Sequence, residues 1–451
     1  MINDGVFYWI FFNFASQFQA HYMNISEIYT LFKKFPIAVT DSRNVCSDSI
    51  FFSLKGANFN GNKFALSTLE KGCRYAIVDE KEYAIDDRFI LVDDVLTCLQ
   101  NLAREHRRQL GIPILAITGT NGKTTTKELV NEVLKKKYKT LATQGNFNNH
   151  IGVPLTLLSM DSDTEFGIVE MGANHSGEIK LLCEIAEPNY GIITNVGKAH
   201  LEGFGSFEGV KRTKKELFDY LSKHDGEVFV NCENEHLIGM LNEQKSLFYG
   251  NSEKAFSKAR FLTAEPKLII ELRSPIGKLY IKTHLIGAYN FENVLAAVTL
   301  GRYFKIDEIA IKQALENYQP SNNRSQMMKT DKNVLFLDAY NANPTSMRAA
   351  IENFASMKMK NKFLILGDML ELGEDAENEH LDLLNLLNEK ELFNTLLVGN
   401  IFSNLSSSYN FESFESVDKL LTYIKRLELK DKYILIKGSR GIKLEKLIEQ
   451  L

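Results

Sequence analysis

Residues 112–125 have the sequence IPILAITGTNGKTT, and this stretch decides the fold of the chain. Residues 112–117 are a continuous apolar run, which is typical of a strand buried on both faces of a parallel sheet. A glycine-rich turn follows and ends in Gly-Lys-Thr, at the start of an expected amphipathic helix over residues 123–137. This order predicts a phosphate-binding loop, because backbone N–H groups at a helix N-terminus bind anions.

The chemistry of this loop depends on Lys123 and Thr124. Lys123 can place a positive charge near the outer phosphates of a nucleotide, and the Thr124 hydroxyl can ligate Mg²⁺. The first glycine of the common P-loop would fall at Ile117, so this loop is shorter, and GTPases and motor-type ATPases are poor models. An incidental glycine turn is the alternative, which the Gly-Lys-Thr ending between a strand and a helix disfavours.

Strand–helix alternation extends from the loop in both directions. Toward the N-terminus we expect short strands at residues 37–39, 50–54, 75–78 and 89–92, and a helix at 95–109. Toward the C-terminus we expect buried strands at 166–169, 190–194 and 227–230, and a marginal hairpin at 268–272 and 278–283. After Pro320 the alternation begins again, with strands at 334–337, 363–366, 395–398 and 433–436. The pattern predicts an α/β protein with parallel, doubly wound sheets and ligands at the strands' carboxyl ends.

A chain of 451 residues is too long for one hydrophobic core. We expect three α/β domains: a smaller one at residues 23–110, a central phosphate-loop domain at 111–319 and a Rossmann-like domain at 320–451. Residues 1–22 are rich in aromatics, but polar residues interrupt them too often for a membrane span, and they lack the features of a secretory signal. We interpret them as an extension foreign to the first domain, with a peripheral amphipathic anchor as the alternative.

The composition argues against several classes of function. Hydrophobic residues make up 44% and charged residues 24%, the balance of an ordinary globular protein. A net charge of −4 gives no reason to expect a nucleic acid or an anionic membrane as partner. The five cysteines are scattered without CxxC spacing, so neither a zinc site nor a disulfide framework is predicted. A reducing compartment, the cytoplasm, is the simpler interpretation.

Two polar residues at expected strand ends are candidates for a metal site. Glu170 follows the strand at 166–169, and His200 closes the segment Asn195-Val196-Gly197-Lys198-Ala199. A carboxylate suits Mg²⁺, which prefers oxygen ligands and usually keeps several waters. A solvated residue or a helix cap is the alternative for Glu170, and a histidine without special role is the alternative for His200.

Further motifs lie on both sides of the loop. They are Thr40-Asp41-Ser42-Arg43, Leu54-Lys55-Gly56, Phe59-Asn60-Gly61, Gly145-Asn146-Phe147-Asn148-Asn149-His150, Gly287-Ala288-Tyr289-Asn290-Phe291-Glu292-Asn293, Asp338-Ala339-Tyr340-Asn341-Ala342-Asn343-Pro344, Leu366-Gly367-Asp368-Met369-Leu370-Glu371-Leu372-Gly373 and Lys437-Gly438-Ser439-Arg440-Gly441. Together with the loop, Glu170 and His200, they resemble the Mur ligases of peptidoglycan synthesis, over nearly everything after Met23.

The resemblance implies an ATP-dependent amide ligase that uses a UDP-muramyl tripeptide and D-Ala-D-Ala, and acts as a monomer. The Asp-Asn-Pro-Arg motif of the diaminopimelate- or lysine-adding member is absent, and residues 340–344 point to the dipeptide-adding member. Two alternatives stay open. One is a sibling ligase, either an earlier muramyl-peptide ligase or a folylpolyglutamate synthase. The other is a non-catalytic nucleotide-binding regulator, against which the full set of expected ATP- and metal-binding residues argues.

The resemblance also implies residue roles. For ATP these are Gly119, Thr120, Asn121, Gly122, Lys123, Thr124 and Thr125 in the loop, Asn290 and Asn293 at adenine, and Arg324 and Asp338 at the triphosphate and ribose. For the UDP end of the substrate they are Asp41, Ser42, Arg43 and Lys55; for the dipeptide, Asn341 and Asn343, with the segment 368–371 nearby. Thr124 and Glu170 would hold one Mg²⁺ ion and His200 a second, while Asn149 would lie beside the reacting carboxylate. Arginine and lysine suit a pyrophosphate, and an asparagine amide can both donate to and accept from a base edge.

Lys214 has two competing interpretations. Related ligases carry a carbamylated lysine in this region, and the carbamate would give the second Mg²⁺ the oxygen ligand that a hard metal prefers. The run Lys211-Arg212-Thr213-Lys214-Lys215 is equally natural for a solvated basic helix face, and Lys215 is an adjacent competitor.

Overall fold

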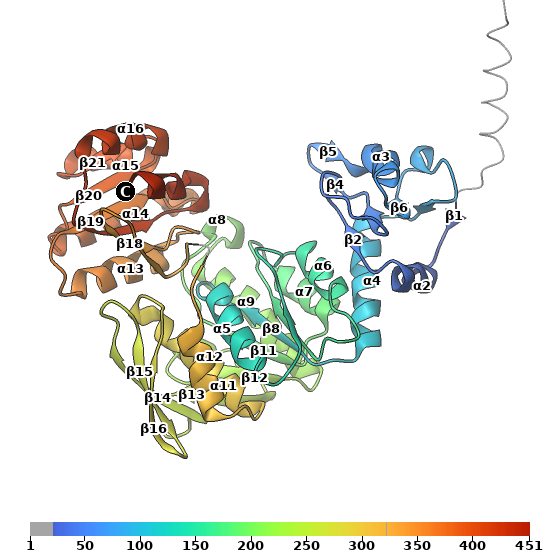
Figure 1. Ribbon diagram of the computed structural model, residues 1–451, viewed down its shortest axis with the longest axis horizontal. Coiled ribbons are helices and arrows are strands. Elements are labelled where there is room, and N and C mark those ends of the chain that lie inside the picture. Colours follow the sequence, from blue (N-terminus) through green and yellow to red (C-terminus); the bar gives the residue numbers. More distant parts are fainter. Residues whose placement is uncertain (1–20, 322) are drawn as a thin grey trace, which may run out of the picture. The chain divides into compact units, whose positions relative to one another are not determined.

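The computed structural model describes residues 21–321 and 323–451 (Figure 1). The expected extension at residues 1–22 therefore lies outside the described residues, apart from His21 and Tyr22. The described chain forms two compact units. The first contains the residues up to 114 together with 143–169 and 181–187, and the second contains residues 115–142, 170–180 and 188–451.

A five-stranded parallel sheet organises the first unit. Its order is β1 (His21–Tyr22), β7 (Phe89–Leu91), β6 (Tyr75–Val78), β3 (Ile50–Phe52) and β2 (Ala38–Val39). The helices of this region are α2 (Ile25–Lys34), α3 (Ala65–Glu70) and α4 (Val95–Leu110). Because the strands are parallel, the segments after β2, β3 and β6 begin at the same edge of the sheet. A short antiparallel ribbon of β4 (Lys55–Gly56) and β5 (Phe59–Asn60) follows β3.

A nine-stranded sheet carries the phosphate loop. Its order is β16-β15-β14-β13-β12-β11-β8-β10-β9, and the bounds are β8 (Ile114–Thr118), β9 (Thr140–Ala142), β10 (Phe166–Glu170), β11 (Tyr190–Ile193), β12 (Glu227–Asn231), β13 (Lys245–Gly250), β14 (Ser257–Thr263), β15 (Ile269–Ser274) and β16 (Gly277–Lys282). The run expected as a buried strand is β8, all of whose residues are buried. The expected marginal hairpin is confirmed as β15 and β16, which pair antiparallel.

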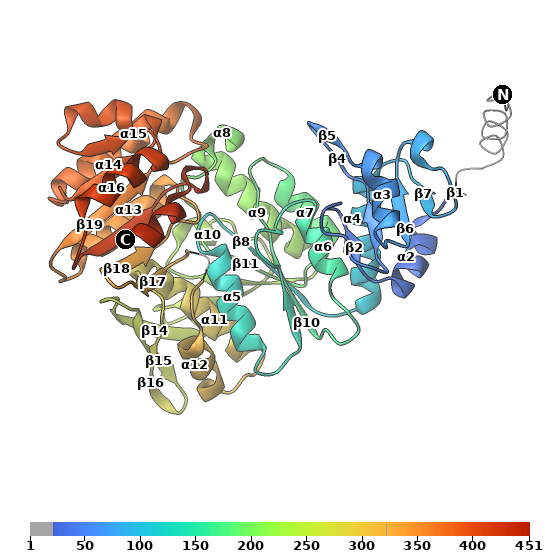
Figure 2. The same ribbon diagram turned by 45° about the horizontal axis from the view of Figure 1, so that its top comes forward.

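Helices cover both faces of this sheet. On one face, α5 (Lys123–Leu134) lies beside α11 (Phe291–Tyr303) and α12 (Glu308–Asn317), as Figure 2 shows. On the other face, α9 (Phe207–Lys223) lies against β11, so tightly that a Cβ at Gly191 would be 2.4 Å from Leu221. The helix expected at residues 123–137 ends at Leu134, and residues 135–138 complete it as a turn.

A six-stranded sheet forms the last part of the second unit. Its order is β17 (Gln326–Lys329), β18 (Val334–Leu337), β22 (Tyr433–Lys437), β19 (Lys362–Gly367), β20 (Thr395–Val398) and β21 (Glu412–Phe414), with only β17 antiparallel. The helices α13 (Pro344–Ser356) and α14 (Ala376–Glu389) bury one face, and α16 (Val417–Leu427) buries the other. Strand β22 lies between β18 and β19, so the loops after these three strands adjoin at the switch point. The expected doubly wound parallel arrangement is confirmed here.

Among the described residues, no helix combines the length and the apolar character that crossing a bilayer requires.

Substitution of Phe354 by alanine should destabilise the six-stranded sheet and its helices. Phe354 on α13 is buried, and its ring lies 5.4 Å from that of Phe336 on β18. Loss of a buried phenylalanine costs about 3–5 kcal/mol. Hydrogen exchange of the strand amides in residues 326–437 should accelerate accordingly. The matched control is Phe393→Ala, which removes a 52% exposed ring from the same sheet region. Equal acceleration in both variants would contradict the prediction.

Candidate active site

Two glycines let the phosphate loop lie directly against its neighbours. Gly119 has a φ of +142°, and a Cβ there would lie 2.0 Å from Oγ1 of Thr194. Gly122 has a φ of +79°, and a Cβ there would lie 2.5 Å from Oδ1 of Asn293. Both backbone conformations favour glycine. A side chain at either position would push the loop away from the segments that support it.

The residues after β11 hold the loop by hydrogen bonds. Asn195 accepts from the Asn121 N–H through Oδ1 (2.9 Å) and donates through Nδ2 to the Asn121 carbonyl (3.1 Å). Its own carbonyl accepts from the Thr120 N–H (3.0 Å), and Thr194 donates from Oγ1 to the Asn121 carbonyl (2.5 Å). Sequence reasoning missed Thr194 and Asn195; the signal that could have found them is a Thr-Asn pair directly after a buried strand.

The N-terminus of α5 is open to an anion. Its N-cap residue, Gly122, has no side chain to cap the helix. Since the first N–H groups of a helix have no intrahelical partner, those of residues 123–125 can bind phosphate oxygens. Lys123 donates from Nζ to the carbonyls of Gly119 (2.7 Å) and Thr120 (2.9 Å). The ammonium group therefore lies over the loop, where a phosphate would compete for its protons.

Burial and the charges of two separate segments act on Lys123. Burial lowers the pKa of Lys123 to about 8, Glu170 at the end of β10 opposes that shift, and Arg324 adds to it. Phosphate groups would supply the negative charge that favours the protonated form.

Two side chains could offer oxygen ligands to a metal ion beside the loop. Thr124 belongs to the loop's own helix, α5, and Glu170 ends β10, the strand next to β8. Both are buried, with 5% and 2% of their surface exposed. No group of three or more His, Cys, Asp or Glu side chains that could hold a metal ion occurs in residues 21–321 and 323–451. One hydroxyl and one carboxylate suit Mg²⁺, which takes its remaining ligands from water and substrate phosphates. The donor set thus fits an ion bound together with a nucleotide.

Lys214 and Lys215 are adjacent on α9 but lie in opposite surroundings. Lys214 is buried, with its Nζ 5.5 Å from the centroid of the Phe204 ring. Burial lowers the pKa of Lys214 to about 7, and the charge of Lys123 contributes to the shift. Lys215 is ion-paired with Asp219 at the surface. A solvated basic face therefore describes Lys215 and not Lys214.

His200 lies at the start of the short helix α8 (Leu201–Phe204), with a φ of +50°. Its Nδ1 is 2.5 Å from Oε2 of Glu371, and its ring packs edge-on against Phe204. Burial is the main cause that lowers the pKa of His200, while Glu371 opposes the shift. The neutral imidazole is the form that binds metals, and Nε2 is the nitrogen that points away from Glu371.

Asn290 and Asn293 form part of a buried ladder of hydrogen bonds under the loop. Asn293 accepts from the Thr126 hydroxyl (3.1 Å) and donates to Oδ1 of Asn290 (2.8 Å). Asn290 donates to the Ile286 carbonyl and to Oγ of Ser325, each at 2.8 Å. An adenine contact stays a prediction, since only 1% of Asn290 and 6% of Asn293 is exposed.

Asp338 and Arg324 are connected by their neighbours in sequence: Asp338 contacts Ser325, and Arg324 contacts Tyr340. Asp338 is ion-paired with the buried Lys437 (Oδ2 to Nζ, 2.6 Å) and accepts from the Ser325 N–H (3.2 Å). The Arg324 guanidinium stacks on the Tyr340 ring, with Cζ 3.5 Å from the ring centroid. Their roles at ribose and triphosphate stay predictions, supported for Arg324 by its effect on Lys123.

The two asparagines predicted to bind the dipeptide differ in their contacts. Asn343 caps α13 by accepting from the Ser346 N–H (2.9 Å), and it donates from Nδ2 to Oδ1 of Asn121 in the phosphate loop (2.7 Å). The Asn341 side chain accepts from the neighbouring Ala342 N–H (3.0 Å), and the Asn341 carbonyl accepts from Nζ of Lys437 (3.5 Å). Asp368, in the nearby segment 368–371, is buried and accepts from two N–H groups at the start of α15 (Asn400–Leu405), those of Ile401 and Phe402. Asp368 thus anchors its loop to the fold.

The residues predicted for the UDP end gather at one edge of the five-stranded sheet. Arg43 binds Asp41 bidentately (2.9 and 2.8 Å), which lowers the pKa of Asp41 to about 2. Lys55 is ion-paired with Asp79 (2.8 Å). The Ser42 carbonyl accepts from Lys71 (3.0 Å). The parallel strands explain the grouping, since these segments follow β2, β3 and β6.

The structure thus brings the predicted residues together in two groups. The loop, Glu170, His200, Lys214 and Arg324 belong to the second unit. The residues for the UDP end belong to the first unit, as does Asn149, whose Oδ1 accepts from the Ile151 and Gly152 N–H groups at the start of α6 (Gly152–Leu158).

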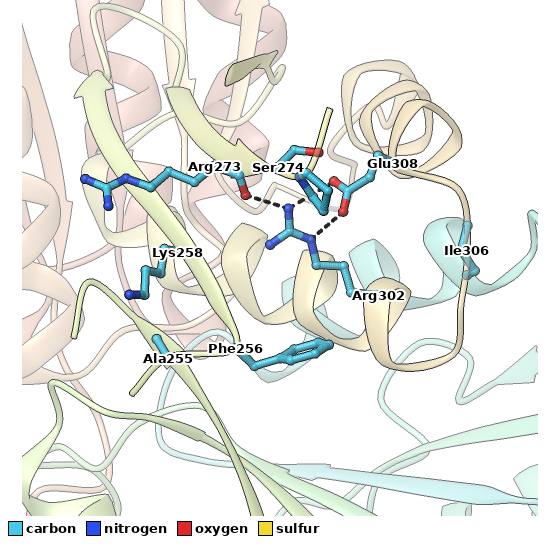
Figure 3. A pocket seen from close by; sticks show the side chains of 9 residues that line it. Ala255, Phe256, Lys258, Arg273, Ser274, Arg302, Ile306 and Glu308 are labelled. Carbon is cyan, nitrogen blue, oxygen red and sulfur yellow. Dashed lines mark hydrogen bonds and ion pairs between the residues drawn. The ribbon is translucent and has the colours of Figure 1, made fainter. Parts of the chain in front are cut away.

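A cavity of about 420 Å³ lies elsewhere in the second unit, between β14, β15, α11 and α12 (Figure 3). Of the two arginines that line it, Arg302 donates to Glu308 (2.7 Å) and to the Arg273 carbonyl (2.7 Å). Its lysine, Lys258, is ion-paired with Glu253 (3.0 Å). None of the predicted site residues lines this cavity.

Comparison with known proteins defines the class first. The Mur ligase middle domain matches residues 117–301, which contain the phosphate loop, Glu170, His200 and Lys214. The Mur ligase, glutamate ligase domain matches residues 323–440, which contain Arg324 and Asp338. These two matches give the chain the domains of a Mur-type ligase.

Relatives over the whole length narrow the class. UDP-N-acetylmuramoyl-tripeptide–D-alanyl-D-alanine ligase of Bacillus subtilis is 33% identical over 428 residues, covering 91% of this chain and 92% of that protein. MurF from Acinetobacter baumannii has a TM-score of 0.83 at 30% identity and covers 92% of both chains. MurF ligase from Thermotoga maritima, solved in complex with ADP, has a TM-score of 0.80 at 27% identity, over 92% of this chain and 96% of that one. The chain belongs to the Mur ligase family, among its UDP-N-acetylmuramoyl-tripeptide–D-alanyl-D-alanine ligases, and the expected three-domain α/β fold class is confirmed.

Substitution of Asn195 by alanine should loosen the phosphate loop without unfolding the sheet. It removes two hydrogen bonds to Asn121 and leaves that N–H without its acceptor, a cost of about 1–3 kcal/mol. Amide hydrogen exchange in residues 119–125 should rise at least about fivefold, since 1.4 kcal/mol corresponds to a factor of ten. Asn251→Ala is the control, because the Asn251 contact is made by its backbone. Unchanged exchange in the Asn195 variant would show that the hydrogen bonds from Asn195 do not hold the loop.

Proposed function

We propose that this protein is the ATP-dependent ligase that joins D-Ala-D-Ala to UDP-N-acetylmuramoyl-tripeptide in peptidoglycan synthesis, with release of ADP and phosphate. The observation that carries the proposal is the arrangement of charged residues around Lys123 in the phosphate loop. A loop lysine, a strand-end carboxylate and an arginine from the C-terminal part of the second unit act together there, as binding and transfer of a phosphoryl group require. The relatives named above support the substrates, and the ADP complex of the T. maritima relative supports the nucleotide.

In the first step, a carboxylate oxygen of the tripeptide attacks the γ-phosphorus of ATP, and the bond to the ADP oxygen breaks. The product is an acyl phosphate, with ADP as leaving group. The open N-terminus of α5 would hold the phosphates, and Lys123 would exchange the loop carbonyls for phosphate oxygens. Arg324 would add positive charge where negative charge accumulates.

In the second step, the amine of D-Ala-D-Ala attacks the carbonyl carbon of the acyl phosphate. The tetrahedral intermediate then breaks its bond to the phosphate oxygen, the amine loses a proton, and an amide and free phosphate result. Correct placement of amine and carbonyl supplies much of the rate, because a bimolecular step becomes effectively unimolecular. Asn341 and Asn343 would position the dipeptide, and Asn149 would lie beside the reacting carboxylate.

Two Mg²⁺ ions are part of the proposal. When bound, they would neutralise charge on the phosphates and the acyl group. Thr124 and Glu170 would hold the first ion, and His200 and a carbamylated Lys214 the second. Carbamylation needs an unprotonated amine, and a pKa of about 7 provides one at neutral pH.

Further parts of the proposal concern organisation and place. Domain boundaries near residues 110 and 320 are supported by the three larger sheets, since β7 ends at Leu91, β8 begins at Ile114, β16 ends at Lys282 and β17 begins at Gln326. All five cysteines are free thiols, which supports a reducing compartment, the cytoplasm. We propose that the enzyme acts there as a monomer.

The direct test is ADP release by the purified protein with ATP and Mg²⁺. It should require both UDP-N-acetylmuramoyl-tripeptide and D-Ala-D-Ala, because the acyl phosphate forms only on the tripeptide and is consumed by the dipeptide. Lys123→Ala and Glu170→Ala, each checked for a native circular dichroism spectrum, should give no ADP. Release with folate substrates or with another muramyl peptide would favour a sibling ligase. Nucleotide binding without turnover would favour a regulator.

Lys214→Gln should lower kcat by at least about a hundredfold, since even residues that only support metal ligands cost ten- to a hundredfold. Lys215→Gln should stay within about threefold, because Lys215 pairs with Asp219 at the surface. With ¹³C-bicarbonate, a carbamate resonance should be present in the wild type and in Lys215→Gln, and absent from Lys214→Gln. It should weaken from pH 8 to pH 6, as an amine with a pKa of about 7 becomes protonated. A resonance that persists in Lys214→Gln would exclude this assignment.

A further inference from the structure

In a doubly wound sheet, ligands bind at the carboxyl ends of the strands where the strand order switches, and in the six-stranded sheet β22 separates β18 from β19 there. Three loops adjoin there, at residues 338–343, 368–373 and 438–441. Most of their charged side chains already have charged or hydrogen-bonded partners. Asp338 is paired with Lys437, Asp368 accepts N–H groups from α15, and Glu371 contacts His200.

Arg440 is different. It is exposed, and among the described residues its guanidinium contacts Tyr340: NH1 donates to the Tyr340 hydroxyl (3.2 Å), and Cζ lies 5.2 Å from the ring centroid. No carboxylate is recorded as its partner in the described chain. Since NH1 is used on Tyr340, the edge formed by Nε and NH2 is left for a planar, bidentate acceptor.

The loop that carries Arg440 is held rigidly. The preceding residue, Ser439, is buried, accepts from the Leu370 N–H through Oγ (2.9 Å) and donates its own N–H to the Asp368 carbonyl (3.1 Å). Gly438 lies so close to Gly367 that a Cβ on it would be 2.8 Å from the Gly367 Cα. The guanidinium is thus supported by fixed backbone, as recognition of a small ligand requires.

Tyr340 carries a second guanidinium, that of Arg324, at 3.5 Å from its ring centroid. Arg324 shifts the pKa of Lys123, so it lies within the field of the phosphate loop, and Arg440 does not contribute to that shift. One aromatic ring therefore links two arginines with different surroundings. This arrangement suits a reaction in which two anions, a triphosphate and a carboxylate, are held side by side.

We infer that Arg440 binds the terminal carboxylate of the incoming dipeptide, with Tyr340 as the residue that positions it. The inference rests on the proposed function and deepens it. At neutral pH the carboxylate is the only anionic group of D-Ala-D-Ala, and the nucleophilic amine lies at the opposite end of the molecule. Fixing the carboxylate at Arg440 leaves the amine free to reach the acyl phosphate.

The test compares D-Ala-D-Ala with D-alanyl-D-alaninamide, which has the same shape and lacks the negative charge. In the wild type, KM for the amide should exceed KM for the acid by roughly ten- to a hundredfold, the range of a charged hydrogen bond. In Arg440→Gln, KM for the acid should rise to the level of the amide and the discrimination should vanish. KM for ATP and for the UDP-linked substrate should stay within about twofold, and kcat at saturating dipeptide should be largely kept, since the lost contact concerns binding.

Further variants separate charge, geometry and fold. Arg440→Lys should keep part of the discrimination, because an ammonium offers a point charge without the fork. Tyr340→Phe should raise KM for the dipeptide a few fold while the preference for the acid persists. Lys443→Gln, an exposed charge change in the same segment, should behave as the wild type.

The outcomes distinguish failure of the Arg440 assignment from failure of the proposed function. If Arg440→Gln prefers the acid as strongly as the wild type does, or raises KM for ATP instead, the assignment of Arg440 is wrong while the proposed function stands. If the wild type does not turn over with D-Ala-D-Ala at all, both the proposed function and this assignment fail.

Discussion

The structure of the site depends on a close contact between Gly119 and Thr194 that leaves no room for a side chain at Gly119. Gly119 lies so close to Thr194 that even a methyl group would overlap its hydroxyl. This fit sets the phosphate loop against the end of β11, where Thr194 and Asn195 bind its backbone. The same segment continues to Lys198, whose N–H donates to Thr345 on α13 (3.1 Å). The position of the loop is therefore coupled to the elements that carry the C-terminal side of the site.

The site also contains several buried basic side chains. Lys123, Lys214 and His200 all have lowered pKa values, with burial as the main cause in each case. Repulsion by Arg324 contributes at Lys123, and repulsion by Lys123 contributes at Lys214 and His200. Such a cluster is disfavoured until an anion enters it, because buried like charges are poorly screened. A triphosphate would relieve this repulsion. The lowered pKa of Lys214 would also favour the carbamylation proposed above, because that reaction needs an unprotonated amine.

Two acidic residues of the C-terminal sheet have structural contacts within the fold. Asp368 anchors its loop to α15, and Asp338 is held by the buried Lys437. Both follow parallel strands at the switch point, which is the place where sequence reasoning expects ligand contacts. Among the described residues of the loops at this switch point, the guanidinium of Arg440 has no carboxylate partner, which would suit a negatively charged ligand.

The sequence by itself determined the element types and the family. Long apolar runs such as residues 114–118 and the glycine turn after them have one stable arrangement, because local propensity and burial agree. Among the strands that it did not predict are β13, β14, β17 and β21. Their sequences mix charged and apolar residues, so that no clear period marks them. Only the tertiary structure distinguished Lys214 from Lys215, revealed the support by Thr194 and Asn195, and singled out Arg440. Each of these depends on which side chains from distant segments enclose or neutralise a group, and spacing along one chain carries no information about that.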